Sequence, residues 1–341
     1  MKRIAIVYFA VLVVGLAATA AHALDQVKTA ERTVMGTVKS VSALKVVVEE
    51  RNGKEAEVPA GQIESITFDE EPAVLKTARV AVSAGRYEDV LAALAGVNAA
   101  EIGRREIVQE IEYYKVYSAA RMALVGNGDI AEAGSKVFAF VSANKDSYHY
   151  LEAQMLLGEL LGASGKPQAA QGAYITVGQT APWPDYRARA AVALGHSYLA
   201  TGQIPEASNS FKNVLNTPDT TPGIQAYKLA ATLGEARCLA ATDKLDQAIG
   251  MIENVIKQAD SEDNELLAEA YNALGASYRA SSRPKDALLA FLNVHLVYFN
   301  SPKNHIEALQ NLVELWNEQQ MPERSAEAAR ILRDRYKRSP R

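Results

Sequence analysis

The pattern of apolar and polar positions changes once along the chain, near residue 70. From Thr33 to Phe68, apolar and polar residues alternate in four short runs, TVMGTV, LKVVVEE, EAEVP and QIESITF. Alternation with a period of two is typical of strands that bury one face. Asn52-Gly53 separates the second run from the third, and this dipeptide is a strong hairpin signal. We therefore expect a small β domain over residues 24–71, built as a curled sheet or a small barrel.

After Asp69-Glu70-Glu71-Pro72 the alternation disappears, and residues 72–341 carry Ala and Leu at spacings of three and four, which is typical of helices. A column of the form Ala/Leu-Gly-x-x-Tyr recurs along this part at intervals of 37, 41, 39 and 38 residues. Weaker copies lie near Ala78 and Arg121. The best copies of the column are at Gly158, Gly195, Ala236, Gly275 and Val313. Self-similarity at such intervals predicts a helical solenoid of about seven helix pairs.

The motifs of this repeat resemble those of the tetratricopeptide repeat family. That family has Leu-Gly and Tyr in its first helix, and Ala and Phe in its second. The best copy has Leu194-Gly195, Tyr198, Ala207 and Phe211. A second has Leu274-Gly275, Tyr278, Ala287 and Phe291, and a third has Leu157-Gly158, Leu161, Ala170 and Tyr174. The small residue lets two helices approach, and the aromatic ring fills the groove beside it. The resemblance implies an α/α superhelical array, with longer connections than the family's repeat of about 34 residues.

The β segment resembles SH3-like or Sm-like small barrels in texture. It is near the lower size limit for independent stability, so we expect it to be stabilised by packing against the helices that follow. The fold class expected for the chain is mainly α, a tetratricopeptide-like solenoid preceded by a small β-barrel-like domain.

Residues 1–23 have the layout of a secretory signal peptide. Lys2 and Arg3 precede an apolar run from Ile4 to Leu16, and small residues lead to Ala21-His22-Ala23. This layout predicts cleavage after Ala23. The alternative is an uncleaved anchor, but the run is shorter than the roughly 20 residues that a spanning helix needs. We expect an exported protein, periplasmic or otherwise extracytoplasmic, that begins at Leu24.

Composition and charge limit the class of partner. The formal net charge is −4, and such a mildly acidic chain lacks the clustered Lys and Arg that nucleic-acid binding requires. We therefore expect no nucleic-acid partner. Cys238 is the single cysteine, so no internal disulfide can form, and this residue is interpreted as a small buried hydrophobe.

One stretch invites a catalytic interpretation. Gly195-His196-Ser197-Tyr198-Leu199 is one residue short of the Gly-x-Ser-x-Gly elbow of hydrolases, because Leu199 replaces the second glycine. The second copy, at 275–279, keeps the serine but has Ala276 in place of His196. Neighbouring residues on a helix point about 100° apart, so Ser197 and His196 cannot readily face each other. A packing role is therefore preferred, and a serine hydrolase using Ser197 is the alternative function.

The remaining candidates for chemistry are isolated. The histidines after the signal peptide make no His-x-x-x-His or Cys-x-x-Cys pattern, so we expect no metal and no cofactor. They are His149, His196, His295 and His305. Trp183 lies between two prolines, Pro182 and Pro184. It has two interpretations, an anchor for a ligand or a plug in the seam between two repeats, and we prefer the second.

The family resemblance also implies a binding surface. In tetratricopeptide folds the concave groove is lined by first-helix positions two, five, nine and twelve, counting the small residue of the column as eight. Transferred to this sequence, these positions are Glu152, Glu159, His196, Leu199, Arg237, Glu269, Asn272, Arg279, Gln310, Glu314 and Asn317. Such a mixed polar groove suits an extended peptide or a partner helix.

The function expected from these features is a non-enzymatic exported scaffold that binds a protein or peptide partner in the concave groove. Helical solenoids offer long concave surfaces for this purpose. The ending YKRSP, residues 336–340, resembles the ends of repeats in envelope-assembly proteins of the same family, which suggests a task in the cell envelope. The sequence leaves membrane contact and the oligomeric state open.

Overall fold

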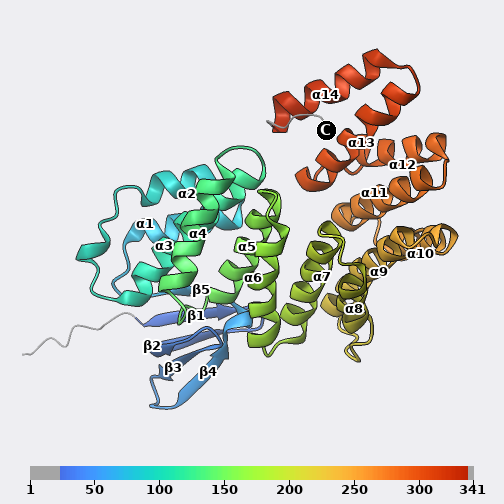
Figure 1. The fold of residues 1–341 in the computed structure, drawn as a ribbon. Helices are drawn as coiled ribbons and strands as arrows, with labels where there is room; N and C mark the ends of the chain where they lie inside the picture. Colours follow the sequence, from blue (N-terminus) through green and yellow to red (C-terminus); the bar gives the residue numbers. More distant parts are fainter. Residues whose placement is uncertain (1–23, 337–341) are drawn as a thin grey trace, which may run out of the picture.

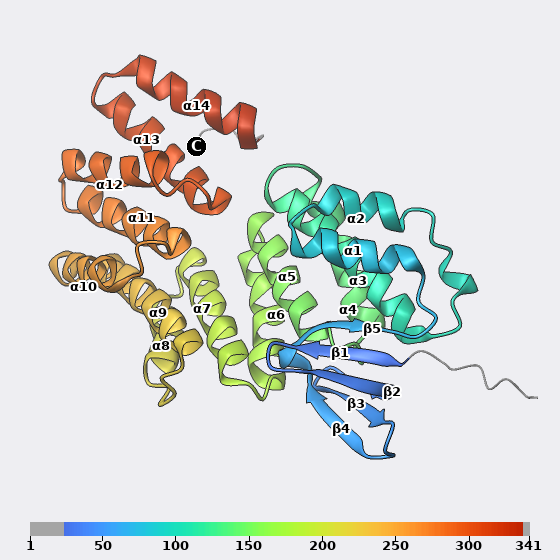
Figure 2. The same ribbon diagram turned by 180° about the vertical axis from the view of Figure 1, so that it is seen from behind.

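A computed structural model describes residues 24–336, and Figures 1 and 2 show its ribbon from opposite sides. The predicted signal peptide and all but the first residue of YKRSP lie outside the described residues. Within them, five strands precede 14 α-helices. The expected order, a small β region followed by a helical array, is confirmed.

The five strands form one antiparallel sheet in the order β4-β3-β2-β1-β5. They are β1 (Asp25–Thr29), β2 (Thr33–Val41), β3 (Lys45–Glu50), β4 (Glu55–Pro59) and β5 (Ile63–Thr67). The turn between β3 and β4 contains Gly53 with φ of 80°, as the Asn-Gly signal predicts. Strand β1 was not expected from the sequence. The sheet is open, with β4 and β5 at its edges, and not a closed barrel, because helices cover its apolar face.

The two faces of the sheet differ as the alternation requires. Val27, Val34, Val46, Val48 and Ile66 are buried on the face toward the helices. The other face carries cross-strand ion pairs, Lys28 with Glu64, Lys39 with Glu49, and Lys45 with Glu57. Charged residues near the edges disfavour pairing with another sheet.

The helices form seven consecutive antiparallel pairs. Their bounds are α1 (Ala73–Ser83), α2 (Tyr87–Leu94), α3 (Arg105–Leu124), α4 (Ile130–Ala143), α5 (Tyr150–Ala163), α6 (Pro167–Thr180), α7 (Pro184–Ala200), α8 (Ile204–Leu215), α9 (Pro222–Ala241), α10 (Leu245–Gln258), α11 (Asn264–Ala280), α12 (Pro284–Leu296), α13 (Pro302–Glu318) and α14 (Pro322–Tyr336). Six of them begin with proline, whose fixed φ and missing N–H suit the first helical position.

The turn inside each pair has the same construction. In each pair, the second residue after the end of the first helix adopts a positive φ. This conformation reverses the chain and satisfies the last carbonyls of that helix. Four of these residues are glycines and three are not: Gly85, Gly126, Gly165, Gly202, Asp243, Ser282 and Gln320. The periodic column of the sequence therefore corresponds to a repeated turn as well as to a repeated helix contact.

The predicted contact between small and aromatic residues is present in three pairs. A Cβ atom added to Gly195 would lie 2.6 Å from the Phe211 ring, and one on Gly275 would lie 2.7 Å from the Phe291 ring. On Gly158 it would lie 2.4 Å from Tyr174. Distances under 3 Å leave no room for a side chain, so these glycines allow the first and second helices of a pair to touch.

The sheet and the helices α1–α5 share one hydrophobic core. Asp25 of β1 is buried and joins them, since its carboxylate accepts from Arg104 Nη1 at 2.8 Å and from the backbone N–H groups of Val38 and Asp69. The ring of Trp183, before α7, packs against Gly61 beside β5. Trp183 therefore has a packing role, but it fills the space between the sheet and the helical array and not, as predicted, a seam between two repeats.

A buried charge network lies within this core. Glu110 of α3 is bonded to His149 Nε2 and to the Tyr148 hydroxyl, both at 2.8 Å, and it lies 3.4 Å from Arg79 of α1. Arg79 also donates to Glu71 at 2.6 Å. Burial alone would raise the pKa of Glu110, but His149, Arg79 and Tyr148 hold it below its ordinary value of 4.5. The carboxylate is therefore charged and fully partnered inside the core.

The array curls so that its last helix, α14, returns to the second helix pair. In both ribbon views the end of α14 lies beside the turn between α3 and α4. The backbone oxygen of Tyr336 is 3.0 Å from where a Cβ on Gly126 would stand. The odd-numbered helices contact one another along the array, as the inner helices of a curled solenoid do, and we call them the inner helices.

Candidate partner-binding surface

A series of charged contacts joins the inner helices, and we call it the inner-face ladder. Its first part joins α3, α5 and α7. Arg121 Nη1 lies 2.8 Å from Glu159 Oε2, and Arg189 contacts Glu152 at 2.6 Å and Glu159 at 3.4 Å. The ladder consists of Arg121, Glu152, Glu159, Arg189, His196, Arg237, Glu269, Arg279, Glu307, Glu314 and Glu318.

The middle of the ladder skips one inner helix at each step. His196 Nε2 on α7 lies 3.2 Å from Glu269 Oε1 on α11, and Arg237 on α9 lies 3.5 Å from Glu307 on α13. Such contacts require a tightly curved array. They leave these side chains only partly accessible, with 21% of His196 and 27% of Arg237 exposed.

The last part of the ladder is more open. Arg279 of α11 contacts Glu314 at 2.5 Å and Glu318 at 2.6 Å, both on α13. These three side chains are 31%, 35% and 50% exposed. Their polar groups are held in place and still reach solvent, which is the combination that a binding surface requires.

The electrostatics of the middle part differ from those of a catalytic site. The pKa of His196 is lowered to about 4, mainly by burial and in smaller part by the nearby cations Lys303 and Arg237, against the opposing effect of Glu269. The imidazole is therefore neutral at neutral pH. A histidine with so low a pKa is a weak general base.

Four residues of the predicted groove lie outside the ladder. Asn272 of α11 is fully buried and donates to the Asn304 backbone oxygen on α13 at 2.9 Å, so it belongs to helix packing. Gln310 is half-buried and Asn317 is exposed, both on α13. Leu199 is half-buried and packs in the cluster around Phe211.

Ser197 has a structural partner. Its hydroxyl donates to the backbone oxygen of Pro167 at 2.6 Å, which ties α7 to the start of α6. The hydroxyl is not bonded to His196, whose ring instead packs edge-on against Phe211. In the second copy, the Ser277 hydroxyl donates to the Ala273 oxygen. Neither serine is arranged as a nucleophile beside a base.

Several members of the ladder were not predicted from the sequence. Arg189 and Glu307 occupy the same repeat position as Glu152 and Glu269, six residues before the column. Applying that position to every copy would have found them. Glu318 carries no such signal, because it is recognised only by its contact with Arg279.

Over residues 24–336, no group of three or more His, Cys, Asp or Glu side chains is arranged to hold a metal ion. In the same part of the chain, no helix is long and apolar enough to cross a membrane.

Solved structures of other proteins have the same fold. A tetratricopeptide repeat protein from Parabacteroides merdae superposes with a TM-score of 0.57 at 14% sequence identity, over 77% of this chain and 91% of that one. The apo form of the quorum sensor NprR from B. thuringiensis gives a TM-score of 0.57 at 18% identity, over 76% of this chain and 74% of that one. The predicted tetratricopeptide-repeat fold is therefore confirmed.

No protein-family model matches the sequence. A search of curated proteins finds no significant match either.

Proposed function

We propose that this protein is a non-enzymatic scaffold that binds an extended segment of a protein partner along the inner-face ladder. The ladder itself carries the proposal. It presents paired cations and anions drawn from every inner helix between α3 and α13, from Arg121 on α3 to Glu318 on α13. An extended chain can contact several such helices at once, as concave solenoid surfaces allow.

The ladder is also pre-organised for binding. Its side chains already hold one another, so a partner would not have to immobilise long flexible groups, and the entropy cost of binding is reduced. The more exposed end, around Arg279, Glu314 and Glu318, is the part that we expect to contribute most. Arg237 would contribute from deeper in the curl.

The arrangement of Ser197 supports a scaffold over the alternative serine hydrolase. Its hydroxyl is bonded to the Pro167 oxygen, and the adjacent His196 is a weak base with a pKa of about 4. A hydrolase would need the serine and a base within hydrogen-bond distance of each other.

Export and a role in the cell envelope are part of the same proposal. They are supported by the basic, apolar and small-residue layout of residues 1–23 and by the YKRSP ending. Strand β1 begins at Asp25, so cleavage after Ala23 would leave the folded part intact. The product should begin at Leu24, which N-terminal sequencing and intact mass would check. A product that keeps residues 1–23 in a membrane fraction would contradict cleavage.

The binding surface can be tested with matched arginine variants. The partner would be captured from the envelope fraction, identified, and titrated against the purified protein. Arg279→Ala and Arg237→Ala should each weaken binding by about 1–2 kcal/mol, as for central interface residues. Arg283→Ala is the control, because Arg283 lies at the α11–α12 turn and pairs with Asp286, away from the ladder.

The same proteins separate the scaffold from the hydrolase. Ser197→Ala should leave partner affinity unchanged. It should lower the free energy of unfolding by about 1 kcal/mol, because the hydrogen bond to Pro167 is lost. Esterase activity that disappears specifically in Ser197→Ala would overturn the scaffold. Equal affinity in the Arg279, Arg237 and Arg283 variants would remove the ladder as the binding surface.

A further inference from the structure

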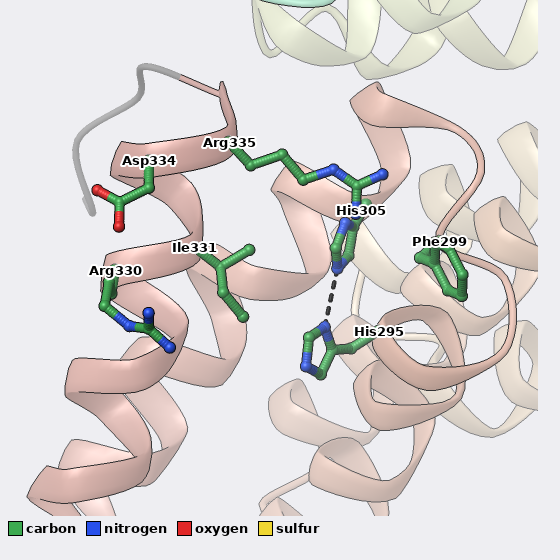
Figure 3. A pocket seen from close by; sticks show the side chains of 7 residues that line it. All are labelled: His295, Phe299, His305, Arg330, Ile331, Asp334 and Arg335. Atoms are coloured by element: carbon green, nitrogen blue, oxygen red, sulfur yellow. Dashed lines mark hydrogen bonds between the residues drawn. The ribbon is translucent and has the colours of Figure 1, made fainter.

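A hollow at the far end of the array is lined by residues that do not belong to the ladder. It has a volume of about 410 Å³ and is formed between α14, the start of α13 and the end of α12. Figure 3 shows its lining: His295, Phe299, His305, Arg330, Ile331, Asp334 and Arg335. We call it the terminal pocket. Its volume lies in the range of small-ligand sites.

The polar floor of the terminal pocket is a chain of three hydrogen-bonded groups. His295 Nδ1 is 2.8 Å from His305 Nε2, and His305 Nδ1 is 2.6 Å from the Tyr336 hydroxyl. Both nitrogens of His305 are therefore used. Among the described residues His295 Nε2 has no hydrogen-bond partner. It is therefore the one ring nitrogen of the two histidines that remains available to a ligand.

One arrangement of the protons along these three hydrogen-bonded groups makes His295 Nε2 a hydrogen-bond donor. If Tyr336 donates to His305 and His305 donates to His295, then His295 carries its proton on Nε2 and can donate it to a ligand. The reverse arrangement makes Nε2 an acceptor. Burial lowers the pKa of both histidines, of His305 to about 4, so neither contributes a charge at neutral pH.

The charge of the terminal pocket comes from its rim. Arg330 makes no ion pair within residues 24–336, and the Arg335 guanidinium lies 5.8 Å from the Phe299 ring centre and 5.2 Å from that of Tyr336. The carboxylate of Asp334 points away from the two histidines in Figure 3 and lies 3.7 Å from Arg333. The lining therefore carries two cations, on opposite sides of Ile331 in Figure 3, and one carboxylate that is turned away from the histidines.

Apolar surface lies beside these cations. Phe299 and Ile331 line the pocket, and Leu296 and Val297, next to Phe299, are 64% and 53% exposed. Arginine forks match carboxylates, and the aromatic and aliphatic walls suit an apolar group attached to one.

We propose that the terminal pocket binds a carboxylate carried by an aromatic or apolar group. Arg330 pairs with the carboxylate, His295 Nε2–H donates to it, and Phe299 and Ile331 contact the apolar part. Arg335 adds positive charge from the other side of Ile331. The ligand is a free organic acid or the end of a polypeptide, and both present the same chemistry. This site goes beyond the proposed ladder function and uses different residues, so either can fail without the other.

Calorimetric titration of the purified protein tests the proposal with matched probes. 3-Phenylpropionate should bind saturably, and its neutral amide should bind about tenfold more weakly, since it loses charge-assisted hydrogen bonds. Arg330→Gln should weaken binding of the acid by about tenfold for the same reason. Arg324→Gln, an exposed site on the same helix outside the pocket, should bind like the unchanged protein.

A second pair of probes identifies the source of the carboxylate. N-acetyl-Gly-Gly-Phe with a free carboxylate is compared with the same peptide as its amide. Tighter binding of the peptide acid than of 3-phenylpropionate indicates a polypeptide end, and weaker binding indicates a free acid. Equal binding of acid and amide, equal affinity in the Arg330 and Arg324 variants, or no saturable binding of either acid would overturn the proposal.

Discussion

The first and last parts of the molecule are held together in different ways. The sheet and α1–α5 share a single hydrophobic core that contains the fully buried Glu110. From α5 onward, buried residues form four smaller clusters, each shared by a few consecutive helices. The ion pairs that join neighbouring inner helices of that part lie in the ladder, where they are partly exposed. We call the two parts the N-terminal block and the C-terminal array.

The two kinds of core imply different distributions of stability. A single core with cross-connections from β1 to α3, such as the one between Asp25 and Arg104, should unfold as one unit. An array of local clusters gains stability from each helix pair and its neighbours. A local change should therefore spread through the N-terminal block but stay local in the C-terminal array.

The largest effect is expected from Glu110→Ala in the N-terminal block. Arg79 and His149 would lose a buried partner, and breaking a buried pair typically costs about 3–5 kcal/mol. Urea unfolding would measure the loss. Amide hydrogen exchange should rise throughout β1–α5 and change little in α11–α14. Glu112→Ala, an exposed site on the same helix α3, is the control, and an equal loss there would argue against the network.

Acid should weaken the C-terminal array before the N-terminal block. His196 and His305 have folded pKa values of about 4 against an ordinary value of 6.5. Between these pH values the unfolded chain binds more protons, so stability is present above pH 6.5 and is lost as the pH falls toward 4. For His305 the loss is on the order of 2 kcal/mol.

The N-terminal block should lose stability only at a lower pH. The pKa of Glu110 is held below 4.5, so its contribution is present above that pH and is lost only on further acidification. Hydrogen exchange followed from pH 7 to pH 4 should show α7–α14 opening first. His305→Gln should flatten this dependence in α12–α14. Simultaneous opening of both parts would contradict the comparison.

Crowding a glycine contact should destabilise one place in the C-terminal array. Gly195→Leu and Gly275→Leu place a side chain where a Cβ already lies within 3 Å of Phe211 or Phe291, and overpacking typically costs about 1–3 kcal/mol. Thermal melts would show the loss, and hydrogen exchange should place it in the altered pair and its neighbours. Unchanged stability in either variant would mean that the helix contact is assigned to the wrong residues.

The smallest expected effect is a gain in stability from adding a side chain at a glycine with open space beside it. A Cβ on Gly250 of α10 would meet nothing within 4 Å, so Gly250→Ala should stabilise the protein by about 0.5–1 kcal/mol through helix propensity. Its melting temperature should rise while those of the leucine variants fall. A loss in this variant would show that space alone does not separate the two kinds of glycine.

Some features of the site could be predicted from the sequence and others could not. Glu152, Glu159, His196, Arg237, Glu269, Arg279 and Glu314 were placed on the inner face by their repeat position, and the structure brings all of them into the ladder. Asn272 has an equivalent position, but it is fully buried against α13. Repeat position predicts the face of a helix, whereas burial depends on how closely the next helix approaches.

The sequence by itself determined the order of elements, the paired helices and the small residues that let them touch. These features follow from local rules, because alternation specifies strands, spacings of three and four specify helices, and a glycine beside an aromatic ring specifies close packing. Only the tertiary structure decided that the sheet stays open on the helices, that His196 meets Glu269 across an intervening helix, and that α14 returns to the α3–α4 turn. Each depends on the curvature of the whole array, which accumulates from small rotations at every helix pair and is not encoded at any single position.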